Sequence, residues 1–192
     1  MDEKIRAFIS LPVSDLVIKE IARIQEIILK KKFVGKVTEL ENLHLTLKFL
    51  GEISKETLVQ VKTALSKISF HQFKAKLLKA GTFSYRGAPK IVWLKIGGKE
   101  IHELQKQIDL ALKDFFKLEA RFMSHMTIAR VKHVADKIAF KEFIAKLPIK
   151  KISFEINSFE LRSSELKPLG PIYTTLQEYF SISSSPETLR SQ

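Results

Sequence analysis

Two stretches of the sequence share one alternating pattern, which constrains the fold more than any other feature. They read NLHLTLKFL around His44 and FMSHMTIAR around His125, so each contains His, apolar, Thr, apolar. Such alternation over a short run is typical of a half-buried strand. Residues two apart on a strand point to the same face. His44 therefore shares a face with Thr46, and His125 shares a face with Thr127, while the apolar residues between them face a core.

These paired side chains have the chemistry that cleavage of a phosphodiester needs. One imidazole can remove a proton from water while the other protonates the leaving oxygen, because an ordinary histidine pKa lies near 6.5. The hydroxyls of Thr46 and Thr127 can donate to the charge on the non-bridging oxygens. A lone strand histidine is more often structural, but the repeat favours catalysis. No metal is expected, because neither motif has a third His or a carboxylate at ligand spacing.

Composition limits the class of protein. The chain has 192 residues, 45% of them hydrophobic, which suffices for one domain or two small lobes. It has no cysteine, so disulfides and thiolate metal sites are excluded. The net charge of +12 indicates a polyanionic partner, with a Lys-rich solvated surface as the alternative. The sequence starts without a signal peptide and has no apolar run of roughly 18 residues, so we expect a cytoplasmic protein that does not bind membranes.

Hydrophobic periodicity predicts a similar order of elements in both halves. The first half is expected to hold strands at 4–11, 33–38, 43–50 and 70–80 and helices at 15–31 and 55–67. After a loop at 81–89, the second is expected to hold strands at 90–96, 118–122, 125–131 and 151–161 and helices at 99–117 and 135–147. A turn at 167–171 and a strand at 172–180 follow.

This repetition suggests an internal duplication, covering about 4–80 and 90–163. We expect an α+β fold of two pseudo-symmetric lobes, each with an antiparallel sheet and outer helices. A central groove would then lie between the lobes, with His44 and His125 facing each other across it. Residues 1–180 would form this single bilobal domain, and the Ser-rich segment 181–192 would be a flexible tail.

The motifs resemble those of the 2H phosphoesterase superfamily. Within it, the block NLHLTLKFLGE around His44 is similar to that of the RNA 2′,3′-cyclic phosphodiesterases, also called 2′-5′ RNA ligases. Four more segments resemble this family in the same order along the chain, from RAFI at Arg6 through IVWL at 91–94 and the block around His125 to GPIY at 170–173. The resemblance runs from about residue 4 to 180. One departure is Ser124, where many members have proline.

The resemblance implies a bilobal fold with a basic groove and no cofactor or metal. It implies opening of a terminal RNA 2′,3′-cyclic phosphate to a 2′-phosphate, and a reverse-type ligation to a 5′-hydroxyl. By resemblance alone, since the two motifs are alike, His44 is the proton donor to the leaving 3′-oxygen and His125 the base toward water. The expected partner is RNA with a cyclic phosphate end, with tRNA fragments as one source, and the expected state is a monomer.

Four further residues are candidates for substrate binding. Alternation places Lys48 on the face of His44, where it would reach a phosphate, although plain surface charge is an equal alternative. Strict alternation places Arg130 on the strand face that points away from His125 and Thr127. The family block nevertheless carries an arginine at this position, and a bulge would turn its side chain toward the substrate. Phe83 is expected either to stack a base or to lie in the core. Tyr173 is expected in the groove from the resemblance only.

Two alternatives to this activity remain open at the level of sequence. The first is a non-catalytic RNA-binding protein, which would not need paired imidazoles. The second is a 2H phosphodiesterase of different specificity, acting on 2′-5′ oligoadenylate, ADP-ribose cyclic phosphate or another small nucleotide. The charge of +12 favours long RNA over a small nucleotide.

Overall fold

The computed structural model describes residues 4–168 and 170–182 and has the predicted α+β architecture. In these ranges, no helix is long and apolar enough to cross a membrane. The helices are α1 (Asp15–Leu29), α2 (Lys55–Leu65), α3 (Lys99–Ala111) and α4 (Lys137–Ala145), with a 3₁₀ turn, η1, at Leu40–Asn42. The strands are β1 (Ile5–Leu11), β2 (Val34–Val37), β3 (Leu45–Ile53), β4 (Phe73–Tyr85), β5 (Ala88–Gly97), β6 (His125–His133), β7 (Ser153–Ile156), β8 (Ser158–Lys167) and β9 (Gly170–Phe180).

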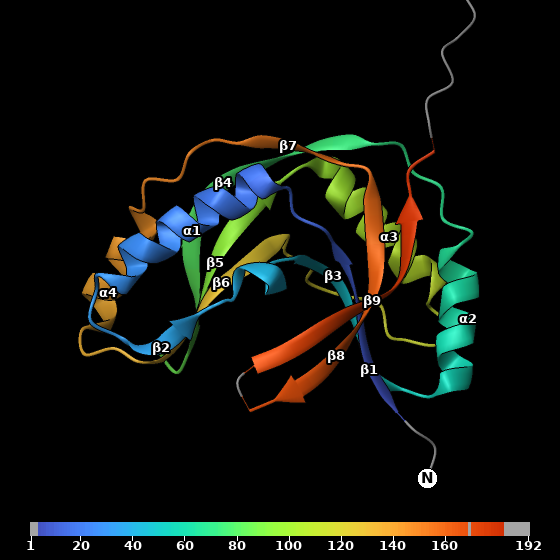
Figure 1. Ribbon diagram of the computed structural model, residues 1–192, viewed down its shortest axis with the longest axis horizontal. Coiled ribbons are helices and arrows are strands. Elements are labelled where there is room, and N and C mark those ends of the chain that lie inside the picture. Colours follow the sequence, from blue (N-terminus) through green and yellow to red (C-terminus); the bar gives the residue numbers. More distant parts are fainter. Residues whose placement is uncertain (1–3, 169, 183–192) are drawn as a thin grey trace, which may run out of the picture.

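The strands form two antiparallel halves that meet at a narrow seam (Figure 1). One half has the order β9-β8-β1-β3, and the other has the order β7-β4-β5-β6 with β2 also paired to β6. The halves are joined where β3 pairs with β6, and the register there consists of the single pair Leu45 and Met126. The two lobes predicted from the sequence are thus the two halves of one strongly curled sheet.

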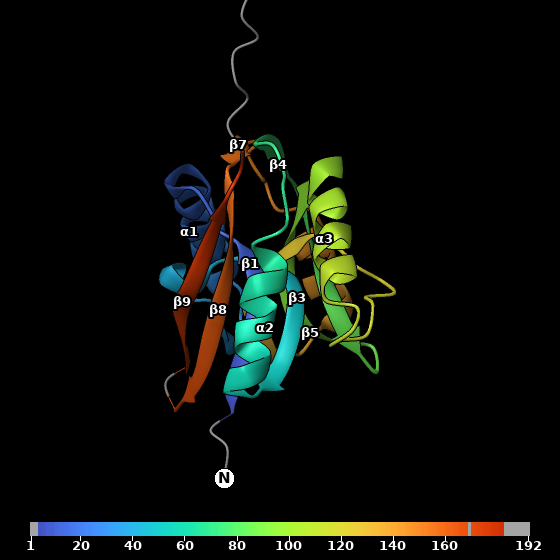
Figure 2. The ribbon, with the colours of Figure 1, turned by 90° about the vertical axis from the view of Figure 1, so that its right-hand side faces the viewer.

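Each lobe is built from elements of both halves of the sequence. Helix α3 follows β5 in the chain but packs on β3, while α1 follows β1 and packs on β6. In Figures 1 and 2, α2 and α3 lie on one side of the molecule, and in Figure 1 α1 and α4 lie on the other. Strand β4 pairs with β5 and β7, and β8 returns to pair with β1. Each lobe therefore contains strands from both sequence halves, and the duplication itself stays a prediction.

The helix periodicity read from the sequence places most of the buried face of α1 correctly, but Leu16, which fits the same period, is 57% exposed. In α1, Val17, Ile21, Ile24 and Ile28 lie on one face and are fully buried. Burial of one such side chain contributes roughly 1.5–3 kcal/mol to stability. Helix α1 ends at Leu29, two residues before the predicted end.

The loop predicted at 81–89 is wrong, because this segment is a tight hairpin. Strand β4 continues to Tyr85, which pairs with Ala88 at the start of β5. The two residues between them, Arg86 and Gly87, have φ values of 48° and 77°. Two consecutive left-handed residues make the turn that matches the twist of paired strands. Of the Gly and Pro residues in this segment, only Gly87 lies in the turn, whereas Gly81 and Pro89 lie within the paired strands β4 and β5.

The segment after α3 also differs from its prediction. The helix stops at Ala111 instead of continuing to 117, and 118–122 is not a strand. The amide of Glu119 donates to the side chain of Asp109 at 2.6 Å, so a carboxylate on α3 holds this segment and no strand ladder does. Similarly, the strand predicted at 151–161 is split at Asn157 into β7 and β8.

The end of the described chain is attached to the fold. The amides of Ser181 and Ile182 donate to the carbonyls of Asn157 and Phe70 at 2.7 and 2.9 Å. These two residues were predicted to start the flexible tail, and that part of the prediction is wrong. Residues 183–192 lie outside the described residues.

Candidate active site

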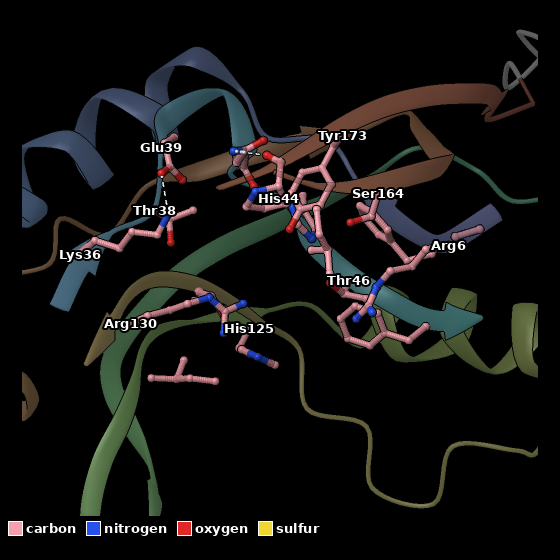
Figure 3. Close-up of a pocket in the computed structure, with 18 of the residues that line it drawn as sticks. Arg6, Lys36, Thr38, Glu39, His44, Thr46, His125, Arg130, Ser164 and Tyr173 are labelled. Atoms are coloured by element: carbon pink, nitrogen blue, oxygen red, sulfur yellow. Dashed lines mark hydrogen bonds and ion pairs between the residues drawn. The ribbon is translucent and has the colours of Figure 1, made fainter. Parts of the chain in front are cut away.

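The two motifs come together at the seam between the lobes. His44 immediately precedes β3, His125 is the first residue of β6, and the pair Leu45 and Met126 aligns the two strands. Both histidines, together with Thr46 and Thr127, line one cavity of about 530 Å³ (Figure 3). The structure therefore brings together all four residues that the sequence singled out for chemistry.

Both imidazoles are held in the same way. Nδ1 of His44 lies 2.8 Å from the carbonyl oxygen of Asn42, and Nδ1 of His125 lies 2.7 Å from that of Met123. A carbonyl oxygen only accepts, so Nδ1 carries the proton in each ring. The other nitrogen, Nε2, is then the one that takes up or releases a proton. A backbone carbonyl two residues upstream thus fixes the tautomer of each histidine.

Burial and positive charge lower the pKa of both histidines. Burial is the main cause that lowers the pKa of His44 to about 4, and the positive charges of Arg162 and Arg130 lower it further. The Asn42 carbonyl has the opposite effect, because it favours the charged ring. Burial also lowers the pKa of His125, and Lys95 adds to it. Lys95 pairs directly with His125 across β5 and β6, so it lies on the same face of the sheet. Both rings are therefore neutral at pH 7 in the free protein.

Aromatic rings pack against each histidine. The ring of Tyr173 meets His44 edge-on at 5.1 Å between centroids, and Phe8 contacts the same imidazole at 4.8 Å. Tyr173 lines the cavity, as the resemblance implied. Phe83 meets His125 edge-on at 4.9 Å and lies outside the cavity lining. Phe83 thus supports the imidazole, and the structure gives it no place in the groove.

A bulge in β6 places Arg130 in the cavity. Thr127 pairs with Trp93 and Ala129 pairs with Val92, so Ile128 has no partner across the ladder. An extra residue reverses the alternation beyond it. Arg130 consequently faces the same side as Thr127 and lines the cavity near His44 (Figure 3). Of the two placements left open by the sequence, the structure selects the one that depends on a bulge.

The equivalent bulge in β3 has the opposite consequence for Lys48. Thr46 pairs with Ser10 and Lys48 pairs with Ile9, so Leu47 is the unpaired residue. Lys48 is turned away from the groove and buried, with its ammonium group hydrogen-bonded to Asp109. The sequence-based prediction that Lys48 shares a face with His44 is therefore wrong, as is its proposed contact with phosphate.

The cavity also contains residues to which sequence reasoning gave no role. Phe49 is turned toward it by the bulge at Leu47, and no alternation pattern reveals a bulge. Most of the others come from β1, the segment around β2 and η1, and the hairpin of β8 and β9, and they include Arg6, Lys36, Thr38, Glu39, Asn42, Ser164, Leu166 and Pro171. Among the described residues, no group of three His, Cys, Asp or Glu side chains is placed to hold a metal ion.

Comparison with known proteins agrees with this geometry. A family model described as LigT like Phosphoesterase matches residues 11–93 and 96–173. The chain belongs to this family. The LigT-like phosphoesterase is 34% identical to the RNA 2′,3′-cyclic phosphodiesterase of Methanocaldococcus jannaschii, over 91% of this chain and 99% of that protein. It is 33% identical to the protein of the same name from Archaeoglobus fulgidus, again over 91% and 99%.

Solved structures confirm the fold of this LigT-like phosphoesterase. A crystal structure of a Thermus thermophilus protein aligns with a TM-score of 0.78 at 24% identity, covering 91% of this chain and 97% of that one. The Escherichia coli LigT protein, solved in complex with 3′-AMP, aligns with a TM-score of 0.76 at 21% identity, covering 94% and 100%. The family membership and the bilobal α+β class expected from the sequence are therefore confirmed.

Proposed function

We propose that this phosphoesterase opens the terminal 2′,3′-cyclic phosphate of RNA to a 2′-phosphomonoester. The observation that carries the proposal is the matched anchoring of His44 and His125, whose Nδ1 atoms are both tied to backbone carbonyls while both rings line one cavity. An RNA substrate is supported by the names of the relatives and by the net charge of +12.

In this mechanism the two histidines act on opposite sides of the phosphorus. Neutral His125 removes a proton from water at Nε2 as the water oxygen forms a new bond to phosphorus. The bond from phosphorus to the 3′-oxygen breaks, and protonated His44 delivers its Nε2 proton to that oxygen. The product carries a 2′-phosphate, and proton exchange with solvent restores both rings. The atoms and protons balance without a further reactant.

The other polar residues of the cavity stabilise the phosphate. The guanidinium of Arg130 suits the non-bridging oxygens, because its planar donors match phosphate geometry. The hydroxyls of Thr46 and Thr127 donate to the charge that grows there. A bound phosphate anion also offsets the repulsion that Arg130 and Arg162 exert on a protonated His44. Substrate binding therefore raises the pKa of His44 and prepares the ring to act as the acid.

The same site supports related activities that we include in the proposal. If the 5′-hydroxyl of a second RNA replaces water beside His125, the product is a 2′-5′ linkage, which is the ligase activity implied by the sequence resemblance. The expected substrate is an RNA end, with tRNA fragments as one source, and the expected state is a monomer. A small nucleotide is the competing substrate, and a purely RNA-binding protein is the competing class.

One product analysis tests this function. The protein is incubated with a short RNA ending in a 2′,3′-cyclic phosphate in the presence of EDTA, and the end group is identified. We expect a 2′-phosphate end. A cyclic end that persists while the RNA binds tightly would favour a binding role, and turnover of 2′-5′ oligoadenylate alone would favour the small-nucleotide alternative. Loss of activity on adding EDTA would contradict the metal-independent mechanism.

A further inference from the structure

Two lysines continue the row of side chains that starts at His125. Strands β6, β5 and β4 are consecutive in the sheet, and Lys95 on β5 pairs directly with His125 on β6. On β4, a bulge places Leu78 and Lys79 together opposite Lys95. Directly opposed side chains leave a sheet about 5 Å apart. Lys95 therefore lies on the face that carries the imidazole, and Lys79 is its next neighbour.

The protein supplies no anion to this pair. Over residues 4–168 and 170–182, neither Lys95 nor Lys79 forms an ion pair with a carboxylate or donates a hydrogen bond from its ammonium group. Lys95 is half-buried, so burial lowers its pKa, and the nearby charge of Lys79 lowers it further. A half-buried ammonium group beside a second one is unfavourable unless an anion compensates for it. The pair therefore has the properties of an anion site whose anion comes from a ligand.

The lysine pair lies next to the catalytic cavity, on the side of His125 that is remote from His44. His125 lines the cavity, whereas Lys95 and Lys79 lie outside its lining. Strand β6 stands between β5 and β3 in the sheet, and His44 immediately precedes β3. The row of cations thus leads from His125 away from His44.

This direction indicates which phosphate of an RNA would reach the pair. In the proposed mechanism, His44 acts on the side of the leaving 3′-oxygen and His125 on the side of the attacking oxygen. When the attacking oxygen is the 5′-hydroxyl of a second RNA, the rest of that RNA extends from the phosphorus on the side of His125. The first phosphodiester of that strand is attached to the ribose that carries the 5′-hydroxyl, so it is the next anion beyond His125.

We infer that Lys95 and Lys79 bind the first phosphodiester of the RNA strand that supplies the attacking 5′-hydroxyl. The inference rests on the proposed function, since it takes His125 to be the base. Water carries no phosphodiester, so this contact distinguishes an RNA nucleophile from water. A lysine meets phosphate as a point charge and reads no base, so the site accepts an RNA strand of any sequence.

Binding measurements with three stable ligands test the inference separately from catalysis. The parent ligand is a 2′-5′-linked adenosine dinucleotide in which the first ribose lacks its 3′-hydroxyl, so that the linkage cannot be opened. The second ligand adds a 3′-phosphate to the second nucleoside, on the side of the attacking strand. The third adds a 5′-phosphate to the first nucleoside, on the opposite side. Both added groups carry the same charge, so general attraction to a basic protein affects them equally.

The variants are Lys95→Met, Lys79→Met, the combination of the two, and Lys90→Met. Lys90 is the matched control, because it is an exposed lysine of β5 that lies an odd number of residues from Lys95 and hence on the opposite face. We expect the wild type to bind the second ligand about tenfold more tightly than the parent, the gain typical of one hydrogen bond to a charged group. Each single variant should reduce this gain and the double variant should abolish it, while Lys90→Met retains it. The effect of the 5′-phosphate should be the same in all variants.

The inference is overturned if the wild type binds the parent and the second ligand equally, or if Lys95→Met reduces the effect of the 5′-phosphate instead. It is also overturned if Lys90→Met reduces the gain as much as Lys95→Met does. Denaturant unfolding should show Lys95→Met to be at least as stable as wild type, because the variant removes an unpaired charge. A purely structural role for Lys95 would lower the stability and leave the gain intact. Failure of the proposed function would appear separately, as a normal gain without hydrolysis of cyclic-phosphate RNA.

Discussion

Lys48 and Asp109 form a buried ion pair that joins β3 to α3, on the side of β3 that faces away from the cavity. The ammonium group also donates to the carbonyl of Lys117 at 2.8 Å, and the carboxylate accepts from the amide of Glu119. Burial alone would raise the pKa of Asp109, but hydrogen bonds from Lys48 and Glu119 outweigh it and hold the pKa below its usual value. The pair thereby fixes the irregular segment that leads from α3 toward His125.

Replacing Lys48 by Met should destabilise the protein by about 3–5 kcal/mol, because it leaves the Asp109 charge buried without its partner. Removing both charges, in Lys48→Met combined with Asp109→Leu, should restore most of this loss. Denaturant unfolding measures both effects. Lys99→Met is the control, since Lys99 is 80% exposed, and it should change stability by no more than about 0.5 kcal/mol. A Lys48→Met variant of normal stability and weakened phosphate affinity would contradict the observed orientation of Lys48.

The pH dependence of kcat/KM should be bell-shaped with its maximum on the acidic side of pH 6.5. In the free enzyme the base, His125, must be neutral, and its lowered pKa places the rising limb below pH 6.5. The acid, His44, must be protonated, and its pKa is about 4, so both bends of the profile, one at the pKa of each histidine, lie below pH 6.5 and the rate falls above the higher of the two. The falling limb of kcat should lie at higher pH, because bound phosphate raises the pKa of His44. The range from about pH 5 to about pH 8 covers the titration of most histidines. A kcat/KM that stays constant over this range would contradict the assignment of His44 and His125 as the acid and the base.

Arg130→Met should raise both the KM for the cyclic phosphate substrate and the pKa of His44 in the free protein. The first effect follows from the loss of a phosphate contact, and the second from the loss of a positive charge near the imidazole. Steady-state kinetics and an NMR titration of the histidine ring report them separately. Arg130→Lys should keep the low pKa of His44 and lose part of the binding, because an ammonium group cannot form a bidentate contact. An unchanged pKa in Arg130→Met would show that Arg130 lies too far from His44 to act with it.

Substrates with different leaving groups should separate the roles of the two histidines. His44→Ala should lose about 10²- to 10⁴-fold on a 2′,3′-cyclic phosphate, whose leaving oxygen needs a proton. The same variant should lose less than about tenfold on a p-nitrophenyl phosphodiester, whose leaving group is stable as an anion. His125→Ala should be impaired on both substrates. The reverse pattern would exchange the acid and base assignments.

The sequence predicted the features that depend on strong periodicity. The repeated motifs around His44 and His125 located the two strands that meet at the cavity, and the spacing of Val17, Ile21, Ile24 and Ile28 located the buried face of α1. These predictions succeed because burial on one face of a helix or strand imposes a period that single residues do not disturb.

The features that the sequence missed depend on single irregular residues or on long-range pairing. The bulges at Leu47 and Ile128 reverse the faces of Lys48 and Arg130, and the sequence carries no local mark of an unpaired residue. Likewise, the pairing of β8 with β1 brings Leu166 to the groove, and no local sequence pattern indicates which strands will pair. The family block around Arg130 gave the only hint of a bulge.

The most direct test of the paired acid–base mechanism compares His44→Gln, His125→Gln and the double variant on an RNA with a 2′,3′-cyclic phosphate end. We expect each single variant to lose at least about 10²-fold in kcat while binding RNA normally. The double variant should be little worse than either one, because the two groups act in the same step. A single variant with a rate near that of the wild type would contradict the mechanism.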